Sequence, residues 1–409
     1  MSEHVVVVGA GHAAGQVVAT LRQMKFGGDI TLIGEEAWYP YQRPPLSKKF
    51  LAGELAAERL YVKPESFYAT ENVSLLLETR VDGIDREKGT IRTNGGDTLP
   101  YDTLVLALGA TPRRIVLAGS ELDGVCYLRT IADVEHIRAR LLEGCRLTIV
   151  GAGYIGLEVA AVASKMGASV TVVEMLDRVM SRVVSEQISA FYDAEHRRHG
   201  VELLLDTSIS RFCGDQHIES VELTGGDRID TDLVLIGIGV VPNTELASVA
   251  GLTVDNGIVV DDHCRTSDPA IYAVGDCTFH PNEILGRNLR LESVHNALEQ
   301  AKTAASNIGG VDKKYAQVPW FWSDQYDLKL QIVGSSSGYD QTIIRGDMAS
   351  RSFACLYLRD RVLIAADSVN NPRDFLQAKA LILDKAIIDP EVLANPDIAL
   401  KDMIYASRD

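Results

Sequence analysis

The sequence holds few cysteines, and no two of them are spaced as a common redox or metal motif requires. Six cysteines occur among 409 residues, and none is paired at C-x-x-C or C-x-x-x-x-C spacing. This excludes the simple forms of a redox-active dithiol and of a cysteine-held metal or iron–sulfur centre. The cysteines are Cys126, Cys145, Cys213, Cys264, Cys277 and Cys355.

Long apolar runs and an excess of basic residues are also missing. No apolar run approaches the roughly 18 residues of a membrane span, and no basic segment precedes an apolar core at the start of the chain. The formal net charge is −16, which disfavours general attraction to nucleic acid or anionic membranes. We therefore expect a cytoplasmic protein of two or three domains, with no nucleic-acid or membrane partner.

One histidine pair has a spacing that permits metal binding. His196 and His199 are three residues apart on a predicted helix. Arg197 and Arg198 stand between them, and no third ligand is near in sequence. A solvated helix face is therefore expected here, and no metal site is predicted.

The start of the chain carries a dinucleotide-binding pattern. Residues 5–8 are four valines, which is typical of a strand buried in a parallel sheet. A G-x-G-x-x-G/A turn at 9–14 then opens a helix, whose N-terminus attracts a diphosphate. The next strand, at 29–34, is followed by an acid at the distance expected of a ribose-binding carboxylate. The residues expected to contact the nucleotide are Gly9, Gly11, Ala14 and Glu35.

A proline-rich loop follows the second strand. Pro44 and Pro45 exclude both a helix and a central strand, so residues 38–49 are predicted to form a stiff loop. Its cations Arg43 and Lys48 offer extra contacts to a large, permanently held cofactor, which points to FAD. A basic loop that only aids solubility is the alternative.

The opening pattern occurs a second time. Residues 146–150 are a strand, 151–156 are a full G-x-G-x-x-G turn, and 169–174 are a strand that ends in an acid. The apolar strand at 104–108 with its glycine exit also has a counterpart at 231–239, so a whole nucleotide-binding unit is repeated. The residues of the second turn and its acid are Gly151, Gly153, Gly156 and Glu174.

The acid of the second copy predicts which nicotinamide cofactor binds there. The charge of Glu174 repels a 2′-phosphate, whereas its oxygens accept a hydrogen bond from a free 2′-hydroxyl. NADH is therefore favoured over NADPH. Arg178, four residues further on, is a group that would weaken this preference.

Later segments add candidate cofactor contacts. Asp276 ends an apolar strand, where nucleotide hydroxyls are bound in such sheets, although Gly-Asp is also a common turn. Residues 292–306 predict a helix whose stripe of small residues allows a flat ring to approach and whose N-terminus points at it. Alternating strands and a helical tail then predict a third domain, in which Trp320 or Trp322 borders the flavin unless both belong to the core.

These segments predict an α/β protein with two Rossmann-like dinucleotide-binding domains and a C-terminal α+β domain. The FAD-binding domain is expected to be discontinuous, with the NAD-binding domain inserted in it. The predicted bounds are 1–110 with 240–319 for the FAD-binding domain, 111–239 for the NAD-binding domain and 320–409 for the C-terminal domain.

The motifs resemble those of FAD-dependent NADH:ferredoxin reductases of bacterial oxygenase systems, the putidaredoxin-reductase-like branch of the pyridine-nucleotide disulfide reductase superfamily. Segments 43–48, 151–158, 273–277, 292–297 and 319–326 carry the resemblance, which spans nearly the whole chain. It implies a glutathione-reductase-like fold with FAD and NADH as cofactors, and the missing cysteine pair is characteristic of this branch. The implied FAD contacts are Gly9, Gly11, Glu35, Arg43, Lys48, Asp276 and Val294; the implied NADH contacts are Gly151, Gly153, Ile155, Gly156, Glu158 and Glu174; Trp320 is implied to lie near the isoalloxazine.

The resemblance also implies a reaction. NADH passes hydride to FAD, and two electrons then leave singly for a two-iron two-sulfur ferredoxin that feeds an oxygenase. Lys48 is expected to stabilise negative charge on the reduced flavin, with Glu158 as its ion partner. Lys48, Glu158 and Trp320 are thus the candidate catalytic residues. A monomer or weak homodimer is expected, and the candidate docking residues for an acidic ferredoxin are Arg290, Lys313, Lys314 and Lys329.

Two alternatives stay open at this point. One is a flavoprotein with the same reductive half-reaction and another acceptor, such as rubredoxin, oxygen, a quinone or monodehydroascorbate. The other is a redox-responsive interaction protein similar to apoptosis-inducing factor, which would be expected to carry a targeting segment and long insertions in its third domain. Neither of those features is visible in the sequence.

Overall fold

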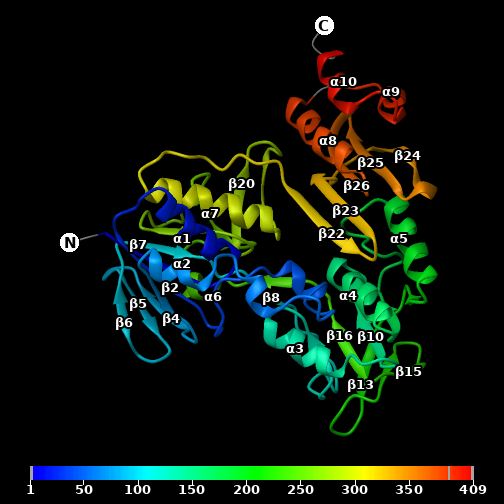
Figure 1. Ribbon diagram of the computed structural model, residues 1–409, viewed down its shortest axis with the longest axis horizontal. Helices are drawn as coiled ribbons and strands as arrows, with labels where there is room; N and C mark the ends of the chain where they lie inside the picture. The colour runs from blue at the N-terminus through cyan, green and yellow to red at the C-terminus, as the bar shows by residue number, and fades with distance from the viewer. Residues whose placement is uncertain (1–2, 386, 407–409) are drawn as a thin grey trace. The chain divides into compact units, whose positions relative to one another are not determined.

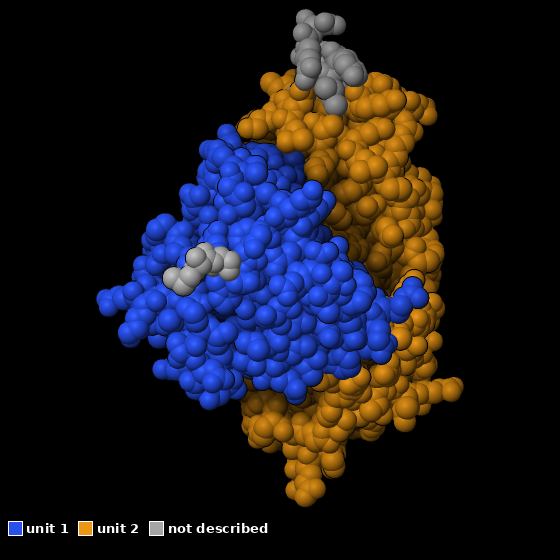
Figure 2. Space-filling model, turned by 60° about the vertical axis from the view of Figure 1, so that its left-hand side comes forward, with its two compact units in different colours: residues 1–43, 57–111, 240–319 blue, residues 44–56, 112–239, 320–409 orange. Residues whose placement is uncertain are grey.

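The structure, a computed structural model, describes residues 3–385 and 387–406 and forms two compact units (Figure 2). The predicted NAD-binding and C-terminal domains share one of these units, and the three-domain division stays a prediction. Within the described ranges, no helix has both the length and the apolar character needed to cross a membrane. Unit 1 comprises Met1–Arg43, Ala57–Thr111 and Val240–Pro319, and unit 2 comprises Pro44–Ala56, Pro112–Gly239 and Trp320–Asp409.

Unit 1 is built on a five-stranded sheet in the order β19-β7-β1-β2-β3. Figure 1 labels β7 and β2 of this sheet. The central strand β1 is the predicted valine strand. Val5 and Val7 face one cluster, which includes helices α1 and α7, whereas Val6 and Val8 face a second cluster. Because both faces of the sheet are covered, an unbroken run of β-branched residues is stable here. The elements of this layer are β1 (His4–Val8), β2 (Asp29–Ile33), β3 (Val73–Leu76), β7 (Thr103–Leu106), β19 (Ile271–Ala273), α1 (His12–Gln23), α2 (Glu65–Thr70), α6 (Glu245–Val249) and α7 (Val294–Ile308).

Smaller strands complete unit 1. Two three-stranded sheets are present, β4-β5-β6 and β18-β20-β21, together with the pair β8 and β17. Their bounds are β4 (Val81–Asp85), β5 (Thr90–Thr93), β6 (Thr98–Pro100), β8 (Ala110–Pro112), β17 (Val240–Pro242), β18 (Ile258–Val259), β20 (Thr278–Asn282) and β21 (Arg287–Leu289).

Unit 2 repeats this sheet. Its order is β12-β11-β10-β16-β9, so β10 has β11 and β16 as parallel neighbours, just as β1 has β2 and β7. The predicted duplication is therefore confirmed at the level of strand pairing. The elements are β9 (Val125–Tyr127), β10 (Arg146–Val150), β11 (Ser169–Val173), β12 (Glu202–Leu204), β13 (Ile209–Cys213), β14 (Ser220–Leu223), β15 (Arg228–Asp230), β16 (Leu233–Ile236), α3 (Ile131–Arg140), α4 (Tyr154–Lys165) and α5 (Glu186–Arg198).

The C-terminal part of unit 2 is an antiparallel sheet followed by helices, which confirms the predicted α+β character. The strand order is β22-β23-β26-β25-β24. The elements are β22 (Trp320–Gln325), β23 (Leu328–Gly334), β24 (Gln341–Asp347), β25 (Ser352–Arg359), β26 (Val362–Val369), α8 (Pro372–Asp384), α9 (Pro390–Ala394) and α10 (Leu400–Ala406).

A buried acid lies in this antiparallel sheet. The carboxyl group of Asp367 on β26 accepts a hydrogen bond from the Tyr357 hydroxyl on β25, and that hydroxyl accepts one from the Ser185 amide over 2.9 Å. Burial raises the pKa of Asp367 from 3.8 to about 7 despite the tyrosine bond. Asp367 therefore couples the stability of the sheet to pH.

We expect Asp367→Asn to remove a pH-dependent part of the stability. The unfolded chain releases this proton near 3.8 and the folded chain near 7, so the stabilisation is complete below pH 3.8 and is lost as the pH rises to about 7. The loss is on the order of 4 kcal/mol, and the asparagine variant lacks it. Urea unfolding between pH 4 and pH 8 measures how the free energy of unfolding changes with pH. The control variant Asp360→Asn, at an exposed residue, should show the same pH dependence as the wild type.

Candidate functional site

The first glycine of each repeated turn is required by the backbone. Gly9 has φ +109°, and a Cβ placed there would lie 2.2 Å from the carbonyl oxygen of Ala107. Gly151 has φ +101°, and its Cβ would lie 2.6 Å from the carbonyl oxygen of Gly237. Each glycine thus lets its turn pass beside the strand exit that sequence analysis paired with it.

The second glycine of each turn leaves open space. A Cβ at Gly11 or at Gly153 would meet no atom within 4 Å. Both residues are N-caps, of α1 and α4, and neither helix has a side-chain cap or an acid in its first turn. Neither N-terminus is thus blocked by a side-chain cap or repelled by a first-turn acid, and a helix N-terminus of this kind attracts a dinucleotide diphosphate. The residues present fit a bound dinucleotide at each of the two turns.

The third position differs between the copies. A Cβ at Gly156 would lie 2.3 Å from the Gly151 carbonyl oxygen, so only glycine fits there. The first copy has Ala14, which is fully buried in the core of unit 1. The sequence pattern treats glycine and alanine as equivalent at this position, but the second turn is the tighter one.

Two adjacent acids, Glu35 and Glu36, follow strand β2, and they have different surroundings. The Glu35 side chain is 71% exposed, and its carboxylate lies 3.9 Å from the Arg80 guanidinium. Glu36, which sequence reasoning missed, accepts hydrogen bonds from Arg43 (2.9 Å) and from the Tyr41 hydroxyl (2.6 Å). The ribose contact of Glu35 stays a prediction, and Glu36 orients the predicted FAD contact Arg43.

In the second repeat the acid lies directly against the turn. The Glu174 carboxylate accepts hydrogen bonds from the amides of Ala152 (2.7 Å) and Leu176 (2.9 Å). The guanidinium of Arg178 donates to the carbonyl oxygens of Val184 (3.0 Å) and Ser181 (2.8 Å). The one cation predicted to weaken the NADH preference is thus held by main-chain oxygens.

Glu174→Gln is expected to relax the cofactor preference. The amide keeps one acceptor oxygen for the two main-chain amides but loses the charge that repels a 2′-phosphate, so the ratio of kcat/KM for NADPH over NADH should rise about tenfold. Steady-state reduction of an artificial acceptor with each cofactor measures the ratio. Asp177→Asn removes the same charge from an exposed neighbour and should leave the ratio unchanged; an equal rise in both variants would argue against a specific role of Glu174.

Three donors converge on the carboxylate of Glu158 in unit 2. Glu158 lies on α4, and its side chain is 4% exposed. Its Oε2 accepts hydrogen bonds from Lys48 Nζ (2.6 Å) and Ser47 Oγ (2.5 Å), and its Oε1 accepts one from Ser323 Oγ (2.7 Å). The predicted Lys48–Glu158 ion pair is confirmed. Sequence reasoning missed both serines, because Ser47 and Ser323 are 111 and 165 residues away from Glu158 in the sequence.

Helix α7 presents only its N-terminus as a candidate contact. Ala297, Ala301 and Ala304 are buried in the same cluster as α1, which α7 contacts directly (Figure 1). The predicted approach of this stripe to a flat ring is therefore wrong, because the small residues serve helix packing. Ser293 caps the helix, and Val294 is its first residue.

The other predicted residues lie at accessible places. Asp276 is half-buried just after β19, next to Gly275, whose amide donates to the side-chain oxygen of Gln300 over 2.7 Å. Ile155 at the start of α4 is 42% exposed. Trp320 is half-buried on β22. Their contacts with cofactors stay predictions.

The expected solvated face of α5 is wrong for one of its two histidines. His196 is fully buried, and its Nε2 lies 2.9 Å from Gln325 Oε1 on β22. His199 is exposed and stacks on Tyr326, with ring centroids 3.7 Å apart. The strand that covers His196 comes from the far C-terminal part of the chain, so the local sequence gave no sign of it.

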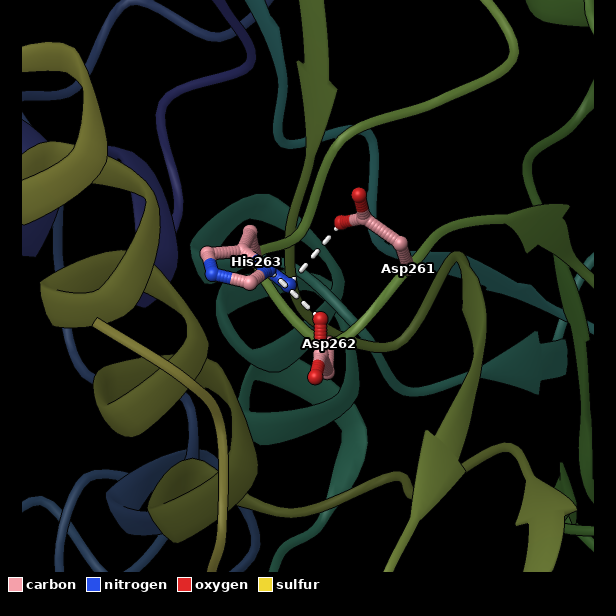
Figure 3. A group of neighbouring side chains, drawn as sticks. All are labelled: Asp261, Asp262 and His263. Carbon is pink, nitrogen blue, oxygen red and sulfur yellow. Dashed lines mark hydrogen bonds and ion pairs between the residues drawn. The ribbon is translucent and has the colours of Figure 1, made fainter. Parts of the chain in front are cut away.

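One group of ligand-type side chains occurs in the part of the chain that the structure describes, at Asp261, Asp262 and His263 (Figure 3). The His263 ring lies 2.5 Å from Asp262 and 2.8 Å from Asp312, through different nitrogens. Lys314 lies 2.8 Å from the other oxygen of Asp262. Because both ring nitrogens and Asp262 are already engaged, we interpret the group as a charge network and assign no metal site.

Three of the buried cysteines are poor thiol nucleophiles. All six cysteines are free. Burial raises the pKa of Cys126 and Cys277 to about 11 and that of Cys355 to about 12, so these thiols stay protonated at neutral pH.

Two of the four predicted docking cations are already paired. Arg290 forms an ion pair with Glu292, and Lys314 forms one with Asp262. Lys313 is half-buried, whereas Lys329 on β23 is exposed. Lys329 therefore remains the strongest of the four candidates.

Two open turns, each on its own parallel sheet, define a protein of the class that binds two dinucleotides for redox chemistry. Comparison with known proteins agrees, since residues 3–301 match the pyridine nucleotide-disulphide oxidoreductase family and residues 320–404 match a reductase C-terminal domain. The chain belongs to the pyridine nucleotide-disulphide oxidoreductase family.

Similar proteins cover the whole chain. The 5,5′-dehydrodivanillate O-demethylase ferredoxin reductase subunit of Sphingobium sp. is 43% identical over 98% of both chains. Putidaredoxin reductase of Pseudomonas putida is 42% identical, over 100% of this chain and 98% of the relative. The reductase of the crystallised covalent putidaredoxin reductase–putidaredoxin complex has a TM-score of 0.96 at 42% identity, covering 99% of each chain.

Proposed function

We propose that this chain is an NADH-dependent, FAD-containing ferredoxin reductase of an oxygenase system. The observation that carries the proposal is the pair of open glycine turns on duplicated sheets, in a chain that is 43% identical to a ferredoxin reductase subunit and 42% identical to putidaredoxin reductase over nearly its whole length. FAD, when bound, accepts a hydride from NADH and releases its two electrons one at a time, which suits a two-iron two-sulfur ferredoxin.

The residues of the chain supply binding, orientation and charge. We assign FAD binding to the turn at Gly9 and Gly11, with Arg43 oriented by Glu36. We assign NADH binding to the turn at Gly151 and Gly153. The further FAD contacts that we propose are Glu35, Lys48, Asp276, Val294 and Trp320, whereas Ala14 serves the packing of α1 because it is fully buried. The further NADH contacts that we propose are Ile155, Gly156, Glu158 and Glu174.

Lys48 supplies a positive charge for the reductive step. Its ammonium is held by Glu158 and by the Pro44 carbonyl oxygen at 3.1 Å, so little reorganisation is needed when negative charge develops nearby. No general base is required of the chain, because hydride transfer moves no separate proton.

Steady-state oxidation of NADH by the purified, FAD-loaded protein tests the function. We expect a two-iron two-sulfur ferredoxin to accelerate NADH oxidation far above the rate with oxygen alone. Rubredoxin and a quinone are the comparison acceptors. Faster turnover with either would replace the ferredoxin assignment, and NADH binding without turnover with any acceptor would favour the interaction-protein alternative.

The ferredoxin is proposed to dock by electrostatic attraction. Partners of this kind are acidic, so exposed cations such as Lys329 are expected to raise the association rate. Raising the ionic strength should then raise the KM for ferredoxin and leave the KM for an uncharged acceptor unchanged. A monomer or weak homodimer in the cytoplasm remains part of this proposal.

A further inference from the structure

A buried chain of hydrogen bonds leads from Glu158 to α5 within unit 2. Ser323 and Gln325 are two residues apart on β22 and thus share one face of the strand. Ser323 Oγ lies 2.7 Å from Glu158 Oε1, and Gln325 Nε2 lies 3.2 Å from Ser323 Oγ. Gln325 Oε1 lies 2.9 Å from His196 Nε2, and the Tyr326 hydroxyl lies 3.0 Å from His196 Nδ1. The three central residues of the chain are at most 1% exposed.

The ion-paired carboxylate determines the direction of every bond in this chain. Glu158 only accepts, so the Ser323 hydroxyl donates to it and accepts from the Gln325 amide nitrogen. The Gln325 oxygen must then accept from an Nε2–H of His196. Burial lowers the pKa of His196 to about 4, so its ring is neutral and Nδ1 accepts from the Tyr326 hydroxyl. Bonds aligned in one direction strengthen one another.

The chain of hydrogen bonds also determines which carboxylate oxygen of Glu158 binds Lys48. With Ser323 on Oε1, both Lys48 and Ser47 share Oε2. A carboxylate with donors on both oxygens is held in one rotation. Without the Ser323 hydroxyl, Glu158 is released to turn and the ammonium of Lys48 moves with it.

We propose that Ser323, Gln325 and His196 are positioning residues that hold Glu158, and through it Lys48, in place for the reduction of FAD by NADH. The inference rests on the proposed function, because Lys48 acts in that step. None of the three residues is proposed to touch a cofactor. They act through the orientation and charge of Glu158.

The first test is Ser323→Ala in the full-length, FAD-loaded protein. Loss of one charge-assisted hydrogen bond is expected to slow flavin reduction by NADH about tenfold and to lower the flavin potential. Ser189→Ala is the matched control, since its buried hydroxyl donates to the Val179 carbonyl oxygen over 2.6 Å outside the chain. Equal rates and equal potentials in the two variants would overturn the proposal.

The second test separates positioning from general packing. His196→Leu is expected to slow reduction about threefold, because it weakens the chain two bonds from Glu158. His196→Gln keeps an amide donor for Gln325 and should restore the rate. The double variant His196→Leu with Ser323→Ala should be no slower than Ser323→Ala alone, since Ser323→Ala already interrupts the chain of hydrogen bonds. If the double variant lost reduction rate by the product of the two single effects, His196 and Ser323 would not act through one chain of hydrogen bonds.

The direction of the chain is tested without any turnover. Nitrogen-15 NMR of histidine-labelled, full-length protein should show a neutral Nε2–H tautomer at His196, assigned by its loss in His196→Gln. An Nδ1–H tautomer at His196 would contradict the proposed direction of the hydrogen bonds and so overturn the proposal. Wild-type protein that NADH fails to reduce would refute the proposed function, whereas normal wild-type reduction with an unaffected Ser323→Ala variant would refute only the positioning role.

Discussion

Lys48→Met is expected to slow the reduction of FAD by NADH about a hundredfold, because it removes one preorganised charge from the place where negative charge is proposed to develop. The same change leaves the buried Glu158 carboxylate with only its two serine donors. An unpaired buried charge is costly, so the free energy of unfolding should fall by about 3 kcal/mol. Stopped-flow absorbance under anaerobic conditions measures the rate, and urea unfolding measures the stability.

A second substitution separates the two effects. In the double variant Lys48→Met with Glu158→Gln, the buried charge is gone, so stability should recover while reduction stays slow. Lys49→Met removes the same charge from the exposed neighbouring residue and should change neither quantity. Recovery of the reduction rate in the double variant would assign Lys48 a purely structural role. An unchanged rate and potential in Lys48→Met would remove Lys48 from the mechanism.

Gly9→Ala is expected to have the largest effect on the fold. The residue has φ +109°, and the new methyl group would lie 2.2 Å from the Ala107 carbonyl oxygen, so both the turn and the strand exit must move. We expect the free energy of unfolding of the apoprotein to fall by about 3 kcal/mol or more and FAD to be lost.

Gly11→Ala is the matched contrast. The methyl group enters open space, so the apoprotein should keep its stability. FAD affinity should nevertheless fall at least about tenfold, because a side chain now stands where the backbone must approach a diphosphate. Denaturation of the apoproteins and titration with FAD, followed by flavin fluorescence, separate the two changes. If Gly11→Ala destabilised the apoprotein as much as Gly9→Ala, the open space at Gly11 would have no functional meaning.

The duplicated turns were predictable because their signals are local. A valine strand, a glycine turn and a helix occur within about twenty residues of each other, and their physical requirements are satisfied mostly within that stretch. The Lys48–Glu158 pair was expected from family resemblance and not from spacing. The sequence could not show whether Glu35 or Glu36 binds Arg43. Two adjacent acids after a strand differ only in which one the folded loop turns toward Arg43.

The sequence by itself determined the two parallel sheets and their glycine turns, because backbone φ and β-branched burial depend on neighbouring residues. Only the tertiary structure decided that His196 is buried and that Ser323 binds Glu158. Their partners are 129 and 165 residues away in the chain, and a helix position is solvated or buried according to what packs on it. Hydrogen bonds of such separation leave no local pattern, so they become visible only when the strands and helices are brought together.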